Sequence, residues 1–366
     1  MNLNTEYSAD NLVLVVNPRV PFTKIGVYNN SKLVFLKRIN HQDEDLKKFS
    51  KYEDQTNYRK DAIISELKDN DVEVDKIRVV ISRGGLLKPV KSGIYAVDEK
   101  VKNDLYNSPL GSDIVNLGGL ICDAIASDLP NANALIADPV VVDEYDEVAR
   151  ITGLPEIKRR SIFHALHQKQ AACRYSKSIH KECEDLNLII AHLGTGITVG
   201  AHKKGRVVDA NMGYDGDGPF SPIRTGSLPT GDLIKLCYSG KYTEEQMLKK
   251  VSLEGGLFAH FGTPSGIDVA KMVEKGDKQA ELVFGAMAYQ VAKTIGSMYA
   301  VLYGQVDAII ITGPMANSNW LVEKIVERVE HFGKIVVYPG SDDIETLAMK
   351  GVAVINGEHE VKEYQG

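Results

Sequence analysis

The chain has 366 residues, of which 43% are hydrophobic and 25% are charged, proportions typical of a soluble globular protein. This length exceeds what one ordinary hydrophobic core supports, so we expect two domains. The net charge of −6 and the isoelectric point near 5.9 argue against a nucleic-acid-binding protein, which would need a basic surface.

The cysteines and the first residues bear on the cellular compartment. Cys122, Cys173, Cys183 and Cys237 include no Cys-x-x-Cys pair, so neither a zinc site nor a disulfide framework is predicted. The opening segment MNLNTEYSADN is polar, unlike a secretion signal, and no apolar run approaches the roughly 18 residues of a membrane span. We expect a cytoplasmic protein.

The chain opens with strand-length apolar segments separated by turns. Strands are predicted over 12–16, 23–28 and 32–38, and the same order returns over 188–191, 197–199 and 206–209. Two such openings predict two domains of one architecture. We place them at 1–150, joined by the C-terminal helix 345–366, and at 151–344, with Thr152–Pro155 as the linker.

The remaining elements follow from apolar spacing. Further strands are expected over 77–81, 134–137, 306–312 and 334–338. Helices are expected over 56–68, 113–127, 161–178, 229–238, 243–251, 277–303 and 319–329, with a last one running to Ile355.

The turn Gly194-Thr195-Gly196 joins two predicted strands rather than a strand and a helix, so it differs from a dinucleotide-binding fingerprint. Such a turn can offer backbone N–H groups to a phosphate. Asp209, Asp215 and Asp217 follow it and are oxygen ligands of the kind that Mg²⁺ prefers. The alternative is an ordinary β-meander with a solvated acidic loop.

Other candidate residues stand at predicted strand ends. Arg83 follows the strand 77–81 and could bind an anion, because ligands of α/β sheets gather at the carboxyl ends of strands. Asp143 follows an apolar run and could be a metal ligand or a helix cap. His164 and His167 share a helix face, and we interpret them as packing residues in preference to metal ligands.

Several long motifs together resemble the acetate and butyrate kinase family, and its butyrate kinases most closely. They are SRGGLLKPV (82–90), SIFHALHQK (161–169), HLGTGITVGAH (192–202), DGDGPFSPIRTGSLPTGD (215–232) and AMAYQVAKTIG (286–296). The resemblance implies an α/β fold of two duplicated actin-like, ribonuclease H-like ATPase domains with a nucleotide cleft between them. It implies phosphoryl transfer from Mg²⁺-ATP to butyrate or another short carboxylic acid, and its reverse.

The resemblance also implies roles for single residues. The catalytic set would be Arg83, Asp143, His192 and Arg224, and the metal-side set Asn17, Asp143 and Asp343. The arginines would hold the acyl carboxylate and the transferring phosphoryl group, and His192 would donate to phosphoryl oxygens. The nucleotide-binding set would be Asn17, Thr23, Lys24, Gly194, Thr195, Gly196, Gly313, Pro314 and Asn317. A homo-oligomer is expected, with the helix 277–303 as a packing surface.

The sequence departs from the family pattern at the turns that would contact the nucleotide. Where the pattern reads Asn-Pro-Gly-Ser-Thr-Ser-Thr-Lys, this chain has Arg19, Val20, Pro21 and Phe22 between Pro18 and Thr23. Two hydroxyl side chains have become Val20 and Phe22, and Pro21 removes one backbone donor, so we expect a weak kinase. The alternatives are an inactive paralogue that binds an acid or a nucleotide, and a kinase of an alcohol on the same scaffold.

Overall fold

The computed structural model describes residues 11–340 and 342–366, which form two compact units. Within these residues unit 1 comprises 11–142 and 342–366, and unit 2 comprises 143–340. The loop 152–155, which the sequence suggests as a linker, lies inside unit 2. The prediction against a secretion signal is based on residues 1–11, and residues 1–10 lie outside the described residues.

Unit 1 is built on a seven-stranded sheet with the strand order β12-β5-β6-β4-β1-β2-β3. β1, β2 and β3 form an antiparallel meander, and β4 and β6 continue the sheet in parallel on the other side of β1. The strands are β1 (Leu12–Arg19), β2 (Phe22–Asn29), β3 (Lys32–Asn40), β4 (Ile77–Arg83), β5 (Ile94–Ala96), β6 (Asn133–Ala137) and β12 (Val361–Lys362).

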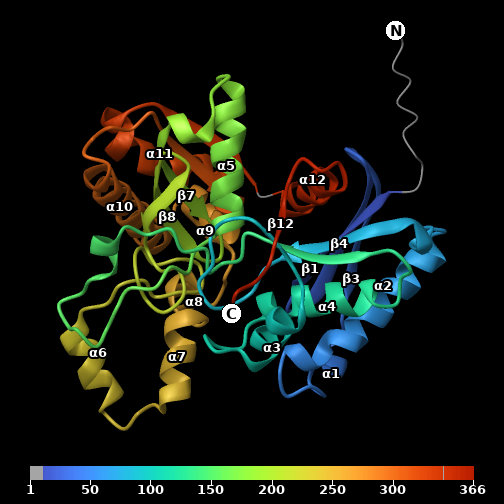
Figure 1. Ribbon diagram of the computed structural model, residues 1–366. Helices are drawn as coiled ribbons and strands as arrows, with labels where there is room; N and C mark the ends of the chain where they lie inside the picture. The colour runs from blue at the N-terminus through green and yellow to red at the C-terminus, as the bar shows by residue number, and fades with distance from the viewer. Residues whose placement is uncertain (1–10, 341) are drawn as a thin grey trace. The chain divides into compact units, whose positions relative to one another are not determined.

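Helices cover both faces of this sheet (Figure 1). Leu14 and Val16 of β1 pack with α2 and α4. Val13, which points to the other face, is approached by α12, where a Cβ at Gly351 would collide with it. Glycine therefore lets α12 lie close to the sheet. The helices are α1 (Asp43–Leu46), α2 (Thr56–Asp69), α3 (Glu99–Asn107), α4 (Leu117–Ala126) and α12 (Asp343–Ile355).

Unit 2 is built on a five-stranded sheet with the order β11-β10-β7-β8-β9. β7, β8 and β9 form an antiparallel meander, and β10 and β11 follow in parallel beside β7. This arrangement repeats that of β1, β2, β3, β4 and β6, so the predicted duplication is confirmed. The strands are β7 (Asn187–Leu193), β8 (Ile197–Lys203), β9 (Arg206–Ala210), β10 (Ala308–Gly313) and β11 (Ile335–Pro339).

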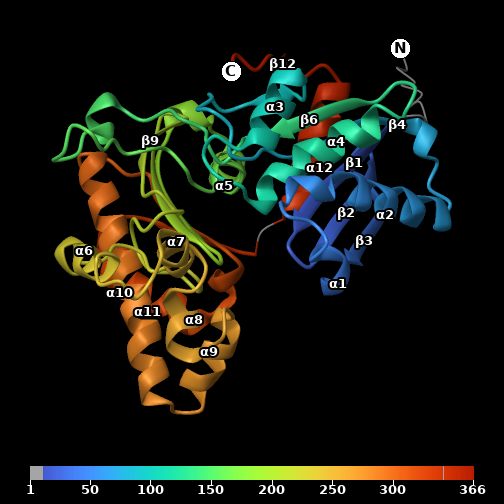
Figure 2. The ribbon, with the colours of Figure 1, turned by 90° about the horizontal axis from the view of Figure 1, so that it is seen from below.

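The helices of unit 2 also cover both faces of its sheet. On one face α10 and α11 lie side by side (Figure 2), where Phe284 stacks on Trp320 with ring centroids 5.5 Å apart. On the other face, Tyr175 of α5 packs against Leu188 and Ile190 of β7. The helices are α5 (Ala165–Ser178), α6 (Thr230–Cys237), α7 (Glu244–Ser252), α8 (Gly256–Phe261), α9 (Gly266–Glu274), α10 (Lys278–Val301) and α11 (Asn319–Val329).

One predicted helix begins later than expected. The sequence predicts a helix from Ser161, but α5 begins at Ala165. The preceding segment bonds to other parts of unit 2 instead, since the carbonyl of Ile162 accepts from Gly213 N at 3.0 Å. His164 also bonds to Thr198. In residues 161–164, tertiary hydrogen bonds therefore override the helical spacing of the apolar residues.

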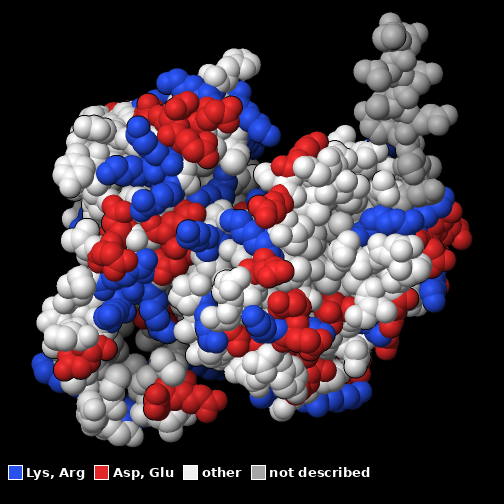
Figure 3. Space-filling model, in the orientation of Figure 1, with Lys and Arg blue, Asp and Glu red and all other residues white. Residues whose placement is uncertain are grey.

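Two surface properties agree with the composition. Among the described residues, no helix is both long enough and apolar enough to cross a membrane. Figure 3 shows basic side chains interspersed with acidic ones on the visible face of each unit, without a broad basic area. This fits the net charge of −6.

Candidate active site

In unit 1, two side chains from the end of β1 meet the first residue of α12. Asn17 Nδ2 donates to Asp343 Oδ2 at 2.9 Å, and Arg19 Nη2 donates to the same oxygen at 2.8 Å. The Asp343 side chain is 5% exposed and that of Arg19 is 37% exposed. A carboxylate in the first turn of a helix is favoured by the helix dipole. The structure thus brings the predicted metal-side residues Asn17 and Asp343 together and adds Arg19 to them.

Arg83 ends β4, the strand next to β1, and is 8% exposed. Its Nε has no hydrogen-bond partner among the described residues. Burial lowers the pKa of the guanidinium to about 10, and the positive charge of Arg19 adds to this effect. The side chain still carries its charge at neutral pH. A buried cation with an unused donor is suited to binding an anion such as a carboxylate.

The turn between β1 and β2 is held from within unit 1 by Arg59 of α2. This arginine is fully buried, and it donates to the carbonyls of Arg19 and Val20 at 2.9 Å each and to that of Phe22 at 3.3 Å. Its other donors reach Gln55 Oε1 at 3.0 and 2.8 Å. Because three turn carbonyls share one cation, the turn has a defined conformation.

The side chains that follow this turn point into unit 1. Thr23 is fully buried, and its hydroxyl accepts from Arg59 Nη1 at 3.0 Å and lies 2.8 Å from His41 Nε2. Phe22 packs under the guanidinium of Arg38, which lies 3.9 Å from the ring centroid. Lys24 is half-buried on β2. The hydroxyl of Thr23 is therefore used internally, and its assignment to the nucleotide stays a prediction.

In unit 2, three histidines gather at the carboxyl end of β7. His192 is 3% exposed, and its ring centroid lies 4.3 Å from that of His164 and 4.4 Å from that of His167. His164 immediately precedes α5 and His167 lies in its first turn. The sequence predicts His164 and His167 as packing residues, but it does not show that they pack against His192. The spacing of three residues at a helix start, with a third histidine ending a strand, was the available signal.

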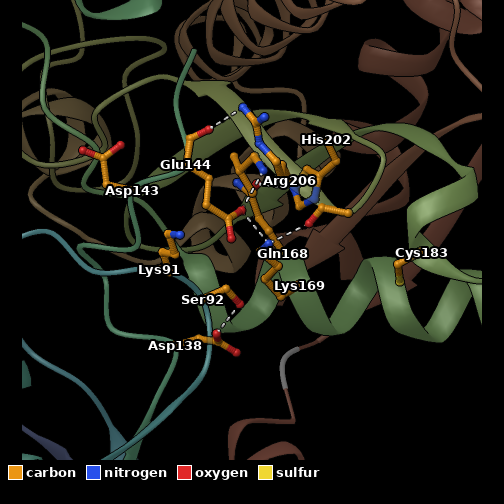
Figure 4. A network of polar contacts seen from close by, with 12 residues as sticks. Lys91, Ser92, Asp138, Asp143, Glu144, Gln168, Lys169, Cys183, His202 and Arg206 are labelled. Carbon is orange, nitrogen blue, oxygen red and sulfur yellow. Dashed lines mark hydrogen bonds and ion pairs between the residues drawn. The ribbon is translucent and has the colours of Figure 1, made fainter. Parts of the chain in front are cut away.

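A chain of hydrogen bonds behind this cluster orients His164. His202 Nε2 lies 3.0 Å from Gln168 Oε1, and Gln168 Nε2 donates to Thr198 Oγ1 at 3.0 Å (Figure 4 shows Gln168 and His202). Thr198 Oγ1 in turn lies 2.9 Å from His164 Nδ1. The Thr198 hydroxyl can accept a second hydrogen bond as well as donate one, so which atom donates in its contact with His164 Nδ1 depends on the tautomer of the ring.

The turn between β7 and β8 lies against Arg224. A Cβ at Gly196 would collide with the Arg224 guanidinium, so glycine permits this approach. The hydroxyl of Ser221 donates to the Thr195 carbonyl at 2.6 Å and ties the Arg224 loop to the turn. The Gly194 amide donates to the Gly196 carbonyl at 3.0 Å. This amide is therefore used inside the turn rather than offered to a ligand in this conformation.

The second predicted nucleotide turn of unit 2 begins at Gly313, the last residue of β10. Its φ of 101° is in the left-handed region, which favours glycine. A Cβ there would also collide with the backbone of Leu193 at the end of β7. Pro314–Asn317 form a short 3₁₀ turn in which Asn317 Nδ2 donates to the Pro314 carbonyl at 2.9 Å. Both predicted nucleotide turns of unit 2 therefore meet at Leu193.

Asp143 is engaged by a neighbouring arginine. Arg150 Nη1 lies 2.6 Å from Asp143 Oδ2, and Asp143 Oδ1 accepts from Tyr145 N at 3.3 Å. The Asp143 side chain is 12% exposed. The proposed role of Asp143 at the metal would require this carboxylate to leave Arg150.

The acidic residues after the β7–β8 turn are paired as well. Asp209 lies 2.8 Å from Arg159, which is also 3.8 Å from Asp217, and Asp215 lies 3.1 Å from Arg160. In the part of the chain that the structure describes, no group of three or more His, Cys, Asp or Glu residues could hold a metal ion. The arginine partners of these aspartates favour the alternative interpretation of a β-meander with an acidic loop over a metal site.

Asp138, which the sequence analysis did not select, follows β6 at the same sheet edge as Arg83. Its Oδ1 accepts from Ser92 Oγ at 2.7 Å (Figure 4) and from Gly93 N at 2.9 Å, and Lys350 lies 2.8 Å from Oδ2. Burial opposes ionisation of this carboxyl, yet Lys350 and these hydrogen bonds leave its pKa below the ordinary value. It is a buried, ionised carboxylate at the carboxyl edge of the unit 1 sheet.

The fold is that of solved carboxylate kinases. Acetate kinase of Porphyromonas gingivalis matches with a TM-score of 0.76 and 18% identity over 94% of this chain and 100% of that one. A propionate kinase from Francisella tularensis subsp. tularensis matches with a TM-score of 0.75 and 18% identity over 93% and 98%. Acetate kinase from Entamoeba histolytica matches with a TM-score of 0.72 and 17% identity over 92% and 97%.

A sequence model of the acetokinase family matches residues 154–356, which is more than half of the chain. The protein belongs to the acetokinase family.

Proposed function

We propose that this protein is a carboxylate kinase that transfers the terminal phosphoryl group of ATP to a short-chain carboxylic acid, reversibly, giving ADP and an acyl phosphate. Membership of the acetokinase family supports the reaction class. The observation that carries the proposal is Arg83, a buried guanidinium with an unused donor at the carboxyl edge of the unit 1 sheet. The catalytic set remains Arg83, Asp143, His192 and Arg224.

The residues suit a transfer between two anions. A carboxylate is already a nucleophile at neutral pH, so the enzyme needs charge neutralisation and alignment more than a strong base. Arg83 would bind the acid carboxylate, and Arg224 would donate to oxygens of the transferring group. His192 and His164 would donate further hydrogen bonds to those oxygens, and the contact of His164 Nδ1 with the Thr198 hydroxyl leaves Nε2 of His164 for the ligand.

The oxygens near Asp343 fit a magnesium ion. Asn17 Oδ1 is buried and has no hydrogen-bond partner among the described residues, and the Asp343 carboxylate lies beside this amide. Mg²⁺ is commonly held by one or two carboxylates together with substrate phosphates. Asn17 and Asp343 would hold the ion, with Asp143 as the third candidate. The ion would neutralise charge on the ATP phosphates.

We assign the nucleotide to unit 2 and the acid to unit 1. The turns at Gly194–Gly196 and Gly313–Asn317 meet at Leu193, which supports their joint use in binding ATP. In unit 1, the first turn lacks the hydroxyl groups of the family pattern. We therefore expect a weak kinase, and butyrate or a branched short acid is our preferred substrate on the resemblance of the motifs.

We further propose that the protein forms a homo-oligomer in the cytoplasm. The long helix α10 exposes Leu282 by 68% and Tyr289 by 49%, although its other face is part of the core of unit 2. Burying these side chains against a second copy would remove apolar surface from water. Sedimentation at micromolar concentration should give at least twice the chain mass of 40.2 kDa. A mass near that of one chain would contradict this proposal.

A coupled assay of ADP release tests the function. Acetate, propionate, butyrate and isobutyrate should be compared at equal concentration with Mg²⁺ and ATP. Turnover with at least one acid is expected, and similar rates for neighbouring chain lengths would be unsurprising because one methylene is worth only about 1–3 kcal/mol. A folded sample that turns over none of them would contradict the proposal.

A second candidate, an inactive paralogue that binds ATP or an acid, is favoured by one observation. The turn Arg19–Phe22 carries no hydroxyl group, and the hydroxyl of Thr23 is bonded to Arg59 and His41. Calorimetry that shows binding of ATP or an acid without turnover would select this candidate.

A further inference from the structure

An arginine holds the carboxylate that begins α12. Arg19 Nη2 lies 2.8 Å from Asp343 Oδ2, the oxygen to which Asn17 also donates. The Asp343 side chain is only 5% exposed, so its charge depends on partners within the protein. Asp343 Oδ2 therefore already accepts hydrogen bonds from Asn17 and Arg19. A hard cation such as Mg²⁺ that bound this oxygen would compete with the Arg19 guanidinium for it.

The main chain keeps Arg19 beside Asp343. Residue 19 is paired with Phe22 across the β1–β2 turn, and Arg59 donates to the carbonyls of Arg19 and Val20 at 2.9 Å each. The Arg19 side chain is 37% exposed, so it can swing away while its backbone stays in place. The backbone therefore holds Arg19 near Asp343, while the Arg19 side chain can still move away from the carboxylate.

Two neighbours of the Arg19–Asp343 contact bear on cation binding. Arg83 is buried nearby and is repelled by Arg19 and attracted by Asp343. Asn17 Nδ2 donates to Asp343, and the buried Oδ1 of Asn17 has no hydrogen-bond partner among the described residues. A cation that contacted both Asn17 Oδ1 and Asp343 would satisfy this oxygen, which the guanidinium at Asp343 Oδ2 leaves without a partner.

We propose that Arg19 is a tethered competitor of the divalent cation, which neutralises Asp343 in the nucleotide-free protein and must be displaced before a metal ion binds there. The inference rests on the proposed function only in assigning the metal to Asn17 and Asp343. It concerns Arg19, where the family pattern has glycine, and it predicts weaker metal binding although Asn17 and Asp343 are both present.

The test measures Mn²⁺ binding by water-proton relaxation, without ATP or acid, on the full chain. Arg19→Ala should bind Mn²⁺ at least about tenfold more tightly than the wild type, equivalent to about 1.4 kcal/mol. Lys32→Ala is the control for net charge, because Lys32 is exposed at the β2–β3 turn. Asp343→Asn in the Arg19→Ala background should abolish the gain. Mg²⁺ should likewise raise the thermal unfolding temperature of Arg19→Ala more than that of the wild type.

The outcomes separate this inference from the proposed function. Equal Mn²⁺ affinity of Arg19→Ala and the wild type would overturn the inference, even if the wild type proves to be an active kinase. A gain that survives Asp343→Asn, or that Lys32→Ala reproduces, would overturn it too, because the effect would then be one of general charge. Tighter Mn²⁺ binding by Arg19→Ala that depends on Asp343 supports the inference, even if no acid is phosphorylated.

Discussion

Replacing Arg59 by methionine should loosen the β1–β2 turn and destabilise unit 1. Arg59 is fully buried and donates to the carbonyls of Arg19, Val20 and Phe22. Methionine fills much of the volume and donates nothing. Arg59→Met therefore leaves these carbonyls and Gln55 Oε1 without the hydrogen bonds that Arg59 donates.

The expected loss of stability is about 3 kcal/mol. Each acceptor that loses a buried donor costs about 1–3 kcal/mol, and water can reach a turn more easily than a core, so we take the low end for three carbonyls. Part of the loss is offset because methionine avoids the cost of burying a guanidinium. That cost is visible in the pKa of Arg59, which burial lowers to about 10.

Denaturant unfolding gives the free energy of unfolding, and hydrogen exchange gives the local effect. Amides of residues 19–23 should exchange much faster in Arg59→Met than in the wild type. Lys32→Met is the control, because Lys32 is an exposed cation at the end of β3 farther from this turn, and a surface change of this kind costs within about 0.5 kcal/mol. Equal stability of Arg59→Met and Lys32→Met, with unchanged exchange at the turn, would refute the reasoning.

Three further predictions concern other residues. The pKa of the Cys183 thiol is lowered, chiefly by a hydrogen bond with Cys173, so Cys183 should be alkylated at lower pH than an ordinary cysteine. Cys173→Ala should shift the alkylation profile to higher pH, and an unshifted profile would contradict this cause. Burial lowers the pKa of His202 to about 3, so this residue stays neutral in the folded protein, whereas in the unfolded chain its pKa is near 6.5. Below pH 6.5 the unfolded chain therefore binds a proton that the folded protein does not. The free energy of unfolding should fall as the pH falls, by about 2 kcal/mol at pH 5 from this group. In urea unfolding, His202→Gln should show a smaller difference between pH 7 and pH 5, and the same difference as the wild type would exclude His202 as its source. Replacing Arg19–Phe22 by Gly-Ser-Thr-Ser should raise turnover at least about tenfold, since each hydrogen bond to a charged ligand is worth about 1.5–3 kcal/mol; unchanged turnover would show that this turn does not limit catalysis.

The duplicated fold could be predicted from the sequence because its signals are local. The apolar run Leu12–Val16 and the glycine turns fix strands and hairpins, and the meander occurs in both units. The short helices α1, α3, α8 and α9 and the short strands β5 and β12 were not predicted. Their conformations depend on tertiary contacts rather than on a long period of apolar residues.

The candidate site was only partly predictable, because its pairings join residues distant in sequence. Asn17 and Asp343 were selected from motifs, but only the structure shows that Arg19 lies on the same carboxylate. The contact of His164 with His192 likewise joins a helix start to a strand end. No spacing in the sequence reveals which arginine pairs with which aspartate, so the partners of the acidic residues in and after β9 could not be predicted.

Trapping the acyl phosphate tests the central claim most directly. Hydroxylamine converts an acyl phosphate to a hydroxamate, which can be measured with ATP, Mg²⁺ and each short-chain acid. We predict hydroxamate with at least one acid, and a loss of at least about 100-fold in Arg83→Ala, because a charge-assisted pair with the carboxylate is worth about 3 kcal/mol. Absence of hydroxamate with every acid in a folded wild-type sample, or full activity of Arg83→Ala, would contradict the account.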